Sequence, residues 1–209
     1  MTGTTGYTAW QRLLETAAIG AFAVLAAAGF HRLAAHASPS GWVIPVAGLA
    51  GWMAADLFSG LVHWAFDRFG NVRTPVLGRS FVRPFREHHV DASRIAHHDF
   101  VETNGASCIA ALPAVLAAAL MPLPSPAWVF LQALALFTVL GILAANQCHK
   151  WAHMEPERIP RLVRLAQRWR LILRPEEHRM HHRRPFDTHY CTASGWLNPA
   201  LNGMLKPWR

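Results

Sequence analysis

The sequence predicts an all-α integral membrane protein with about four transmembrane helices, a cytoplasmic histidine-rich cap and an amphipathic interfacial helix. Hydrophobic residues make up 52% of the chain and charged residues only 15%, against about 25% charged residues in soluble domains. Four apolar stretches approach the roughly 20 residues that span a bilayer. The thirteen histidines and the formal charge of +8 lie mostly between and after these stretches. We expect a single domain over residues 1–209.

The four apolar stretches differ in how clearly they qualify as spans. They are Leu13–Leu33, Gly41–Phe66, Ala106–Leu123 and Ala127–Cys148. The second and fourth are long enough to cross a bilayer. The first has an alternative interpretation as a signal peptide, because Ala35-His36-Ala37 resembles a cleavage site of small residues. The third has an alternative as a membrane-inserted hairpin split at Pro113, because proline disrupts a helix interior.

The basic residues predict how the spans are oriented. Six of the twenty Lys and Arg lie between Arg68 and Arg94, and twelve more follow His149. Cytoplasmic loops carry the excess of Lys and Arg, so both polar segments and both termini are expected on the cytoplasmic side. The positive charge therefore indicates an anionic membrane surface. Nucleic acid is not an expected partner, because no recognition motif is present.

Residues Arg161 to Leu173 are expected to form the amphipathic helix. Apolar side chains repeat there at helical spacing, from Leu162 through Leu165 and Trp169 to Leu173. The arginines lie largely on other faces, and no acidic residue interrupts them. A helix of this kind lies in the headgroup plane of an anionic membrane. The alternative is a helix that packs against the core of its own protein, and both descriptions can hold together.

The histidines gather in four segments that are far apart in the sequence, and eleven of the thirteen fall on the predicted cytoplasmic side. His149 and His153 are four residues apart, so they project from one helical face. His178 and His182 repeat this spacing, with His181 three residues after the first. These motifs contain more histidines than one zinc ion needs as ligands, and their number favours two metal ions. Imidazole suits iron, copper and zinc, so the ligand type leaves the metal open.

Three carboxylates beside the histidines are selected as catalytic candidates: Asp56, Asp67 and Asp99. Asp56 lies inside the second span, where an ionisable residue is costly and functional by default. It is expected to orient a histidine through the second ring nitrogen. Asp67 follows His63 by four residues and lies beside it on a helix. The alternative is that the carboxylates outside the spans only offset the surrounding arginines.

Five strings follow one another between residues 55 and 199. They are ADLFSGLVHWAFDRFG (55–70), FVRPFREHHVDASRIAHHDFVETNG (81–105), NQCHKWAH (146–153), EEHRMHH (176–182) and CTASGWLNP (191–199). Together they resemble the Kua/CarF-type lipid desaturases, the family that includes plasmanylethanolamine desaturase. The first forty residues show no such resemblance.

The resemblance implies a four-helix membrane fold and a centre of two iron ions. It implies that O2 and two electrons, delivered by a cytochrome b5 or a ferredoxin-type donor, are consumed for each double bond. The histidines that match the family pattern as iron ligands are His63, His88, His89, His98, His149, His153, His178, His181 and His182. In the best-matching family members the bond formed is the vinyl ether of plasmalogens, from a 1-O-alkyl phospholipid. Four arginines are expected to hold the lipid phosphate: Arg83, Arg86, Arg183 and Arg184.

Three alternative functions stay open at this point. An acyl-lipid desaturase or hydroxylase would use the same di-iron chemistry. A zinc-dependent membrane hydrolase would attack an ester or amide with metal-bound water, but it needs only about three histidines. A haem-binding electron carrier would place its paired histidines within facing spans rather than at helix ends. The expected location is the inner membrane of a bacterium or the endoplasmic reticulum of a eukaryote, with the site on the cytoplasmic face.

Overall fold

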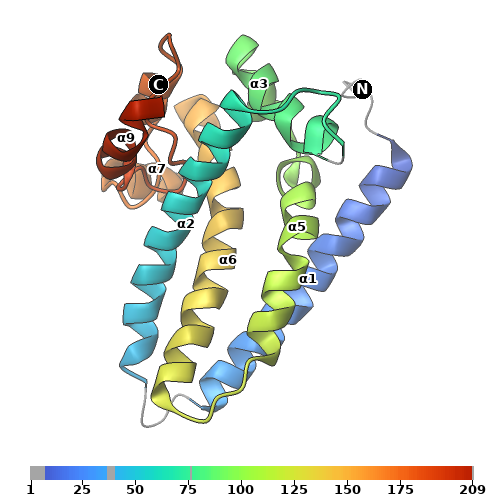
Figure 1. The fold of residues 1–209 in the computed structure, drawn as a ribbon, viewed down its shortest axis with the longest axis vertical. Coiled ribbons are helices and arrows are strands. Elements are labelled where there is room, and N and C mark those ends of the chain that lie inside the picture. Colours follow the sequence, from blue (N-terminus) through green and yellow to red (C-terminus); the bar gives the residue numbers. More distant parts are fainter. Residues whose placement is uncertain (1–7, 37–40, 76, 209) are drawn as a thin grey trace. The chain divides into compact units, whose positions relative to one another are not determined.

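A computed structural model describes residues 8–36, 41–75 and 77–208, and helices are the only regular secondary structure in these ranges (Figure 1). The α-helices are α1 (Ala9–Ala35), α2 (Val43–Arg68), α3 (Arg83–Val90), α4 (Arg94–His97), α5 (Phe100–Leu120), α6 (Pro126–His153), α7 (Arg161–Arg168), α8 (Pro175–His181) and α9 (Asn198–Leu205). A π-helical turn and two 3-10 turns complete them: Gly78–Val82, Pro156–Arg158 and Lys206–Trp208. Helices α1, α2, α5 and α6 are long and apolar enough to cross a membrane. The predicted all-α fold with about four spans is confirmed.

Helix α5 starts earlier than predicted and is continuous. It begins after Asp99, whose carboxylate accepts the N–H groups of Val101 and Glu102 at 2.9 and 3.0 Å. Glu102 in turn accepts the Asp99 N–H at 3.0 Å, which completes a capping box. The helix runs through Pro113 to its last residue, so the alternative of a hairpin split at that proline is wrong. Membrane helices tolerate proline where neighbouring groups satisfy the freed backbone carbonyl.

The chain divides into two compact units. Unit 1 comprises residues 1–51 and 98–143, and thus holds α1, α5 and the N-terminal parts of α2 and α6. Its core consists mostly of small and branched apolar side chains, among them Ala18, Ala47, Val115 and Leu136. The predicted cleavage site after α1 ends at Ala37, which lies outside the described residues.

Helices α1 and α5 of unit 1 are joined by polar contacts at both ends. Near the start of α1, the Arg12 guanidinium forms an ion pair with Asp99 at 2.5 Å. Near its end, Arg32 donates to the backbone carbonyl oxygens of Ala119 and Met121, the second at 3.1 Å. Two arginine side chains therefore fix the register of this helix pair.

The spans leave most of their apolar side chains uncovered by protein. Only 28% to 33% of the residues in their most apolar windows are buried. Val24 of α1, Val46 and Leu49 of α2, and Leu120 of α5 are among the exposed apolar side chains. Exposed apolar surface of this extent is unusual for a soluble monomer and is typical of contact with lipid.

Unit 2 comprises residues 52–97 and 144–209, and holds the C-terminal parts of α2 and α6 together with α3, α4, α7, α8 and α9. Tyr190, Cys191 and Leu201 form one buried apolar cluster against α2. The approach is close at Gly60, where a Cβ atom would come within 2.7 Å of the Cys191 Sγ. A glycine is therefore required for the C-terminal segment to pack against α2.

Helix α7 is shorter than the predicted helix. It ends at Arg168, and Arg170 adopts a left-handed conformation with φ of 59°. The Leu173 N–H then donates to the Ala193 carbonyl oxygen at 2.8 Å. Leu173 is fully buried beside Cys148 rather than lying on the apolar face of the helix. The prediction of a helix to Leu173 is therefore wrong beyond Arg168.

Candidate metal centre

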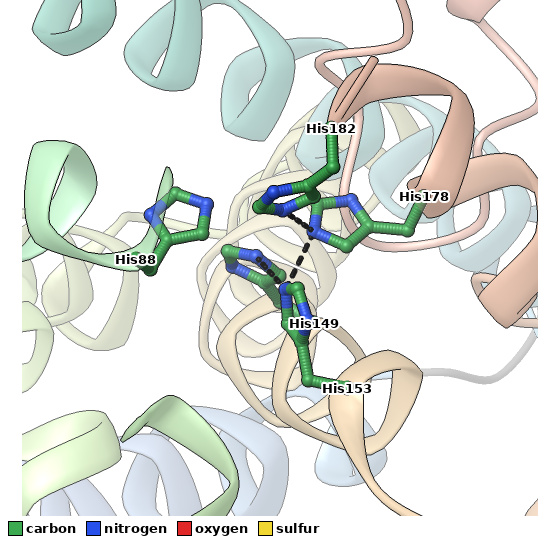
Figure 2. Close-up of side chains that lie close together, drawn as sticks. All are labelled: His88, His149, His153, His178 and His182. Atoms are coloured by element: carbon green, nitrogen blue, oxygen red, sulfur yellow. Dashed lines mark hydrogen bonds between the residues drawn. The ribbon is translucent and has the colours of Figure 1, made fainter. Parts of the chain in front are cut away.

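Unit 2 brings together eight histidines from α2, α3, α6 and the α8 region. Their ring nitrogens form two groups, in each of which one ligand atom per residue lies within 4.8 Å of the others. The five-histidine group contains His88, His149, His153, His178 and His182 (Figure 2). The four-histidine group contains His63, His88, His89 and His181. His88 belongs to both groups, so the two groups adjoin within one cluster.

Helical spacing explains how few elements supply so many ligands. His149 and His153 lie one turn apart at the end of α6, as their sequence spacing predicts. His178 lies in α8, and His182 follows as its C-terminal cap one turn later. Adjacent residues on a helix point in different directions, which lets His181 join the other group.

Four imidazoles of the five-histidine group, those of His149, His153, His178 and His182, converge through their Nε2 atoms. The Nε2 of His178 lies 2.8 Å from that of His153 and 3.0 Å from that of His182. The Nε2 atoms of His149 and His153 are 3.3 Å apart. Two nitrogens that each bind one ion at about 2.1 Å are separated by roughly 3.0 to 3.4 Å for angles between square and tetrahedral. The distances of 3.0 and 3.3 Å lie in this range and that of 2.8 Å lies just below it, so the spacing suits a shared metal ion. Figure 2 shows the rings directed toward one another.

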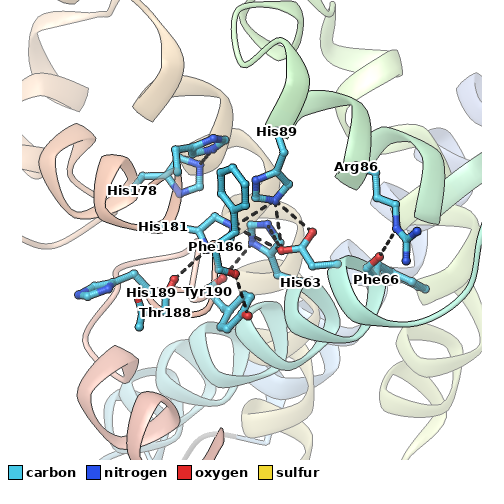
Figure 3. Close-up of polar contacts among 12 residues, drawn as sticks. His63, Phe66, Arg86, His89, His178, His181, Phe186, Thr188, His189 and Tyr190 are labelled. Carbon is cyan, nitrogen blue, oxygen red and sulfur yellow. Dashed lines mark hydrogen bonds and ion pairs between the residues drawn. The ribbon is translucent and has the colours of Figure 1, made fainter. Parts of the chain in front are cut away.

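In the four-histidine group, backbone carbonyl groups fix which nitrogen carries the proton (Figure 3). The Nδ1 of His63 lies 3.1 Å from the carbonyl oxygen of Tyr190, and the Nδ1 of His181 lies 2.8 Å from that of Thr188. A carbonyl oxygen only accepts hydrogen bonds, so each Nδ1 is the donor. In a neutral imidazole the Nε2 atom then carries a lone pair, and it is available to a metal ion.

These lone pairs face the carboxylate of Asp67. The Nε2 atoms of His63 and His181 lie 3.5 and 3.4 Å from its Oδ2 atom. The Nε2 of His89 lies 3.1 Å from Oδ1 and 3.2 Å from the His181 Nε2. An acceptor lone pair beside a carboxylate is unfavourable unless a cation lies between them. The four-histidine group with Asp67 therefore has the charge pattern of a cation site.

Burial keeps the imidazoles outside the spans in the neutral form that binds metal. It is the main cause that lowers the pKa of His88 and His178 well below the ordinary value of 6.5. The pKa of His182 is lowered to about 3, first by burial and then by the neighbouring His153. Within the described part of the chain, the buried Nε2 atoms of His63 and His88 have no hydrogen-bond partner. Buried nitrogens of this kind require a partner, and a metal ion is one that suits a neutral imidazole.

Two predicted site residues belong to unit 1 instead. Among the described residues His98 is a member of neither histidine group. Asp99 serves as the N-cap of α5 and pairs with Arg12. In the sequence both residues directly follow His97 in one histidine-rich string. The boundary between the two units falls between His97 and His98, so the string belongs partly to each unit. Their roles as ligand and catalytic group stay predictions.

Asp56 is fully buried, but backbone amides rather than a histidine occupy its carboxylate. It accepts hydrogen bonds from the N–H groups of Ser194, Gly195 and Leu197. The second nitrogen of His63, two turns further along α2, is held by a carbonyl group as described above. The expected contact between Asp56 and a histidine ring is therefore replaced by contacts to the C-terminal segment.

The four arginines predicted to bind a headgroup lie in α3 and directly after α8: Arg83, Arg86, Arg183 and Arg184. Arg86 donates to the carbonyl oxygens of Phe66 and Phe69 at 3.3 and 3.5 Å, at the end of α2. The Arg184 guanidinium lies 5.9 Å from the ring centre of Phe186. At least Arg86 therefore has a structural partner, and headgroup binding by the set stays a prediction.

Sequence reasoning missed the groups that orient the histidines. The carbonyl oxygens of Thr188 and Tyr190 carry no side-chain signal, so no residue pattern identifies them. Phe85 was also missed, although its ring centre lies 5.0 Å from that of His63. The string CTASGWLNP, which begins directly after Tyr190, is the sequence signal that marks this region.

Comparisons with known proteins agree with this site. A family model described as a lipid desaturase domain matches residues 52–209. A plasmanylethanolamine desaturase of Myxococcus xanthus is 43% identical over 196 residues, covering 94% of this chain and 69% of the relative. Plasmanylethanolamine desaturase 1 of Mus musculus is 39% identical over 175 residues, covering 77% and 60%. The chloroplastic fatty acid desaturase 4 of Arabidopsis thaliana is 35% identical over 161 residues, covering 75% and 47%.

The chain thus spans between about half and about two thirds of the length of these relatives. No solved structure matches it. The matched region contains all eight histidines of the two groups and the whole of unit 2. The resemblance seen in the sequence motifs is confirmed, and the chain belongs to the lipid desaturase family.

Proposed function

We propose that the protein desaturates a membrane lipid, forming the vinyl-ether double bond of plasmalogens in a 1-O-alkyl phospholipid. The observation that carries this proposal is the pair of buried histidine groups that share His88, in a chain of the lipid desaturase family. Two relatives at 43% and 39% identity are named plasmanylethanolamine desaturases, which supports this substrate class. The integral membrane setting supports a substrate that enters from the bilayer.

We assign two iron ions to the cluster, one to each group, with Asp67 as a carboxylate ligand beside the four-histidine group. The donor set of imidazoles and one carboxylate suits iron. When bound, iron would supply the activation of O2. In the overall reaction the lipid loses two hydrogens from neighbouring carbons, and O2 accepts these with two further electrons and two protons to leave as two waters.

The residues of this chain contribute orientation and a dry environment. His63, His149, His178 and His181 are buried, so bulk water is kept from the reactive centre. The carbonyl groups of the C-terminal segment hold the protons of two imidazoles on Nδ1, which leaves each Nε2 facing the centre. Because these ligands are already oriented before the reaction, little free energy is needed to orient them during it.

We place the site on the cytoplasmic face, where a cytochrome b5 or a ferredoxin-type protein would deliver the two electrons. Eighteen of the twenty Lys and Arg lie in unit 2, in agreement with the positive-inside rule. Helix α7 supports an interfacial position, because Leu162 on the helix and Trp169, its C-terminal cap, are 80% and 65% exposed. A spin label at Leu162 should report depth in the acyl-chain boundary, and a label that reports only bulk water would contradict this position.

The headgroup role of the arginines rests on charge and on nearness in sequence to the ligands. Arg183 and Arg184 directly follow His182, and Arg83 and Arg86 lie within two turns before His88. Substitution of each by Gln should change selectivity among phospholipid headgroups while leaving iron content unchanged. Unaltered selectivity in all four variants would remove this role.

The test of the proposed function is lipid mass spectrometry on a host that lacks plasmalogens and receives a 1-O-alkyl lipid. Expression of the intact chain should produce an acid-labile species lighter by two hydrogens. The matched control is His149→Ala, which removes a buried ligand of the five-histidine group. Absence of the new species from cells with iron-loaded protein and a supplied donor would exclude this substrate.

A second candidate is desaturation of an acyl chain, which the relative named fatty acid desaturase 4 supports less strongly, at 35% identity against 43% and 39% for the two plasmanylethanolamine desaturases. The histidine groups suit this reaction equally well, because the position of the double bond depends on the substrate pocket rather than on the ligands. New double bonds in acyl chains, found in the same lipid extracts without any vinyl ether, would select this candidate.

A further inference from the structure

The carboxylate of Asp56 is fully buried in α2 and is saturated by backbone amides of the C-terminal segment. Its Oδ1 atom accepts the N–H groups of Ser194 and Gly195 at 2.7 and 3.0 Å, and its Oδ2 atom accepts that of Leu197 at 3.1 Å. Hydrogen bonds to an ionised acceptor are stronger than those between neutral groups. One side chain of α2 therefore holds a segment that lies about 140 residues later in the chain.

This segment, residues 186–197, which we call the anchor segment, has a backbone that needs external support. Phe186 and His189 have φ angles of 63° and 60°, in the left-handed region that side-chain-bearing residues rarely adopt. Gly195 has a φ of 78°, which glycine adopts without cost. Non-glycine residues stay in this region only when their surroundings determine the conformation.

Side chains from α2 and α9 supply further support for the anchor segment. The Ser59 hydroxyl, one turn after Asp56, accepts the Thr192 N–H at 3.0 Å. The Oδ1 atom of Asn198 accepts the Cys191 N–H at 2.9 Å. The Oδ1 atom of Asn202 in α9 accepts the His189 N–H at 3.0 Å. Because a peptide unit is planar, each N–H that is held in this way fixes the direction of the carbonyl group of the preceding residue.

Two of those carbonyl groups reach the histidine cluster. Thr188 accepts from the Nδ1 of His181 at 2.8 Å, and Tyr190 accepts from the Nδ1 of His63 at 3.1 Å (Figure 3). Partners of this kind orient a ligating imidazole and set its tautomer. A displaced anchor segment would release both rings, and either Nδ1 or Nε2 could then carry the proton.

We infer that Asp56 is a positioning residue for the metal centre, which acts through the anchor segment to keep the Nε2 atoms of His63 and His181 directed at the metal. The inference rests on the proposed iron site. It also explains why an acidic residue is used at this position. Both carboxylate oxygens accept an N–H group, whereas an asparagine would place its own NH2 group against the N–H of either Leu197 or the Ser194–Gly195 pair.

The experiment compares iron affinity with stability in the purified full chain, in lipid nanodiscs, for Asp56→Asn, Ser59→Ala and Leu136→Ala. Iron affinity is measured by competition with a chelator, and stability by the melting temperature. Loss of groups that orient metal ligands typically weakens metal binding by about 10-fold to 100-fold. We expect a weakening of about tenfold or more for Asp56→Asn, and a smaller one in the same direction for Ser59→Ala.

Leu136→Ala is the control, because Leu136 is fully buried in the core of unit 1. It should lower the melting temperature and leave iron affinity unchanged. If Asp56→Asn lowers only the melting temperature, as this control does, the positioning role is overturned and the proposed function stands. If Asp56→Asn does not fold, Ser59→Ala decides, and unchanged iron affinity in that variant overturns the role. An intact chain that binds no iron would instead refute the proposed function itself.

Discussion

Unit 1 and unit 2 use their buried polar side chains in different ways. In unit 1 the buried amides of Asn104 and Gln132 donate to backbone carbonyl oxygens of α5, at 3.0 Å in both cases. In unit 2 the buried imidazoles turn their nitrogens toward one another and toward Asp67. Polar groups that bond to helix backbone stabilise packing, whereas mutually facing acceptors require a further partner. By this criterion unit 1 has the character of a membrane scaffold, and unit 2 has that of a chemical site.

The charges divide between the units in the same way. Unit 2 contains eighteen of the twenty Lys and Arg and nine of the twelve Asp and Glu, which leaves it strongly basic. Unit 1 contains the other two Lys and Arg and the other three Asp and Glu. The lipid desaturase model begins at residue 52, where unit 2 begins. The family is therefore recognised through the unit that carries the histidines and through the second segment of unit 1.

The largest expected effect is the loss of the metal centre by a substitution in unit 2. His178→Ala removes a fully buried imidazole whose Nε2 contacts two others. Desaturation should fall to background, and the iron content of the folded chain should drop. Gln132→Leu is the matched change in unit 1, and it should keep its iron. Metal analysis and lipid mass spectrometry test both variants, and an iron-loaded, active His178→Ala protein would refute the assignment.

A second expected effect is a loss of stability of the metal-free protein in mild acid. Burial lowers the pKa of His88 and His178, and lowers that of His182 to about 3. Below pH 6.5 the unfolded chain therefore binds protons that the folded chain does not, so stability falls as the pH falls. Thermal unfolding between pH 7.5 and pH 4.5 measures this. A melting temperature that stays constant over that range would show that these imidazoles are not buried in neutral form.

A smaller effect is expected from crowding the helix pair of unit 1. In Gly105→Ala the new Cβ atom would lie 2.4 Å from the Cβ of Glu15, so α1 and α5 must move apart. Overpacking of this kind costs about 1 to 3 kcal/mol. The melting temperature should decrease while iron per folded chain stays at the value of the intact protein. A loss of iron without a change in stability would contradict the division of roles between the units.

The smallest effect is expected at the start of α5. Asp99→Ala removes the N-cap and the ion pair with Arg12, and the loss of such a cap costs about 1 kcal/mol. Thermal unfolding checks this value. The same variant tests the catalytic role predicted from the sequence, because a fall in turnover per folded, iron-loaded chain would support that role. Normal turnover would leave Asp99 as a cap alone.

Much of the fold could be predicted from the sequence, because span length and apolar composition depend on the bilayer rather than on tertiary detail. The helix after Arg161 could be predicted only in part. Ile172 and Leu173 continue its apolar spacing, but they are apolar because they pack beside Cys148 and Ala152. Periodicity cannot distinguish the two causes, since both place apolar residues at similar intervals.

The histidine ligands could be predicted because helical spacing carries their geometry. Eight of the nine predicted ligands lie in the two groups, and His98 does not. The role of Asp56 could not be predicted from spacing, because its partners are backbone N–H groups of the anchor segment. Backbone partners are independent of residue type, and only the folded chain identifies them.

The most direct test of the central claim is the metal content of the purified full chain beside that of His88→Ala, the residue shared by both groups. We predict close to two iron ions per intact chain, with a Mössbauer spectrum of non-haem iron, and a loss of iron from both positions in the variant. One zinc ion per chain, with activity that survives iron chelation, would contradict the account.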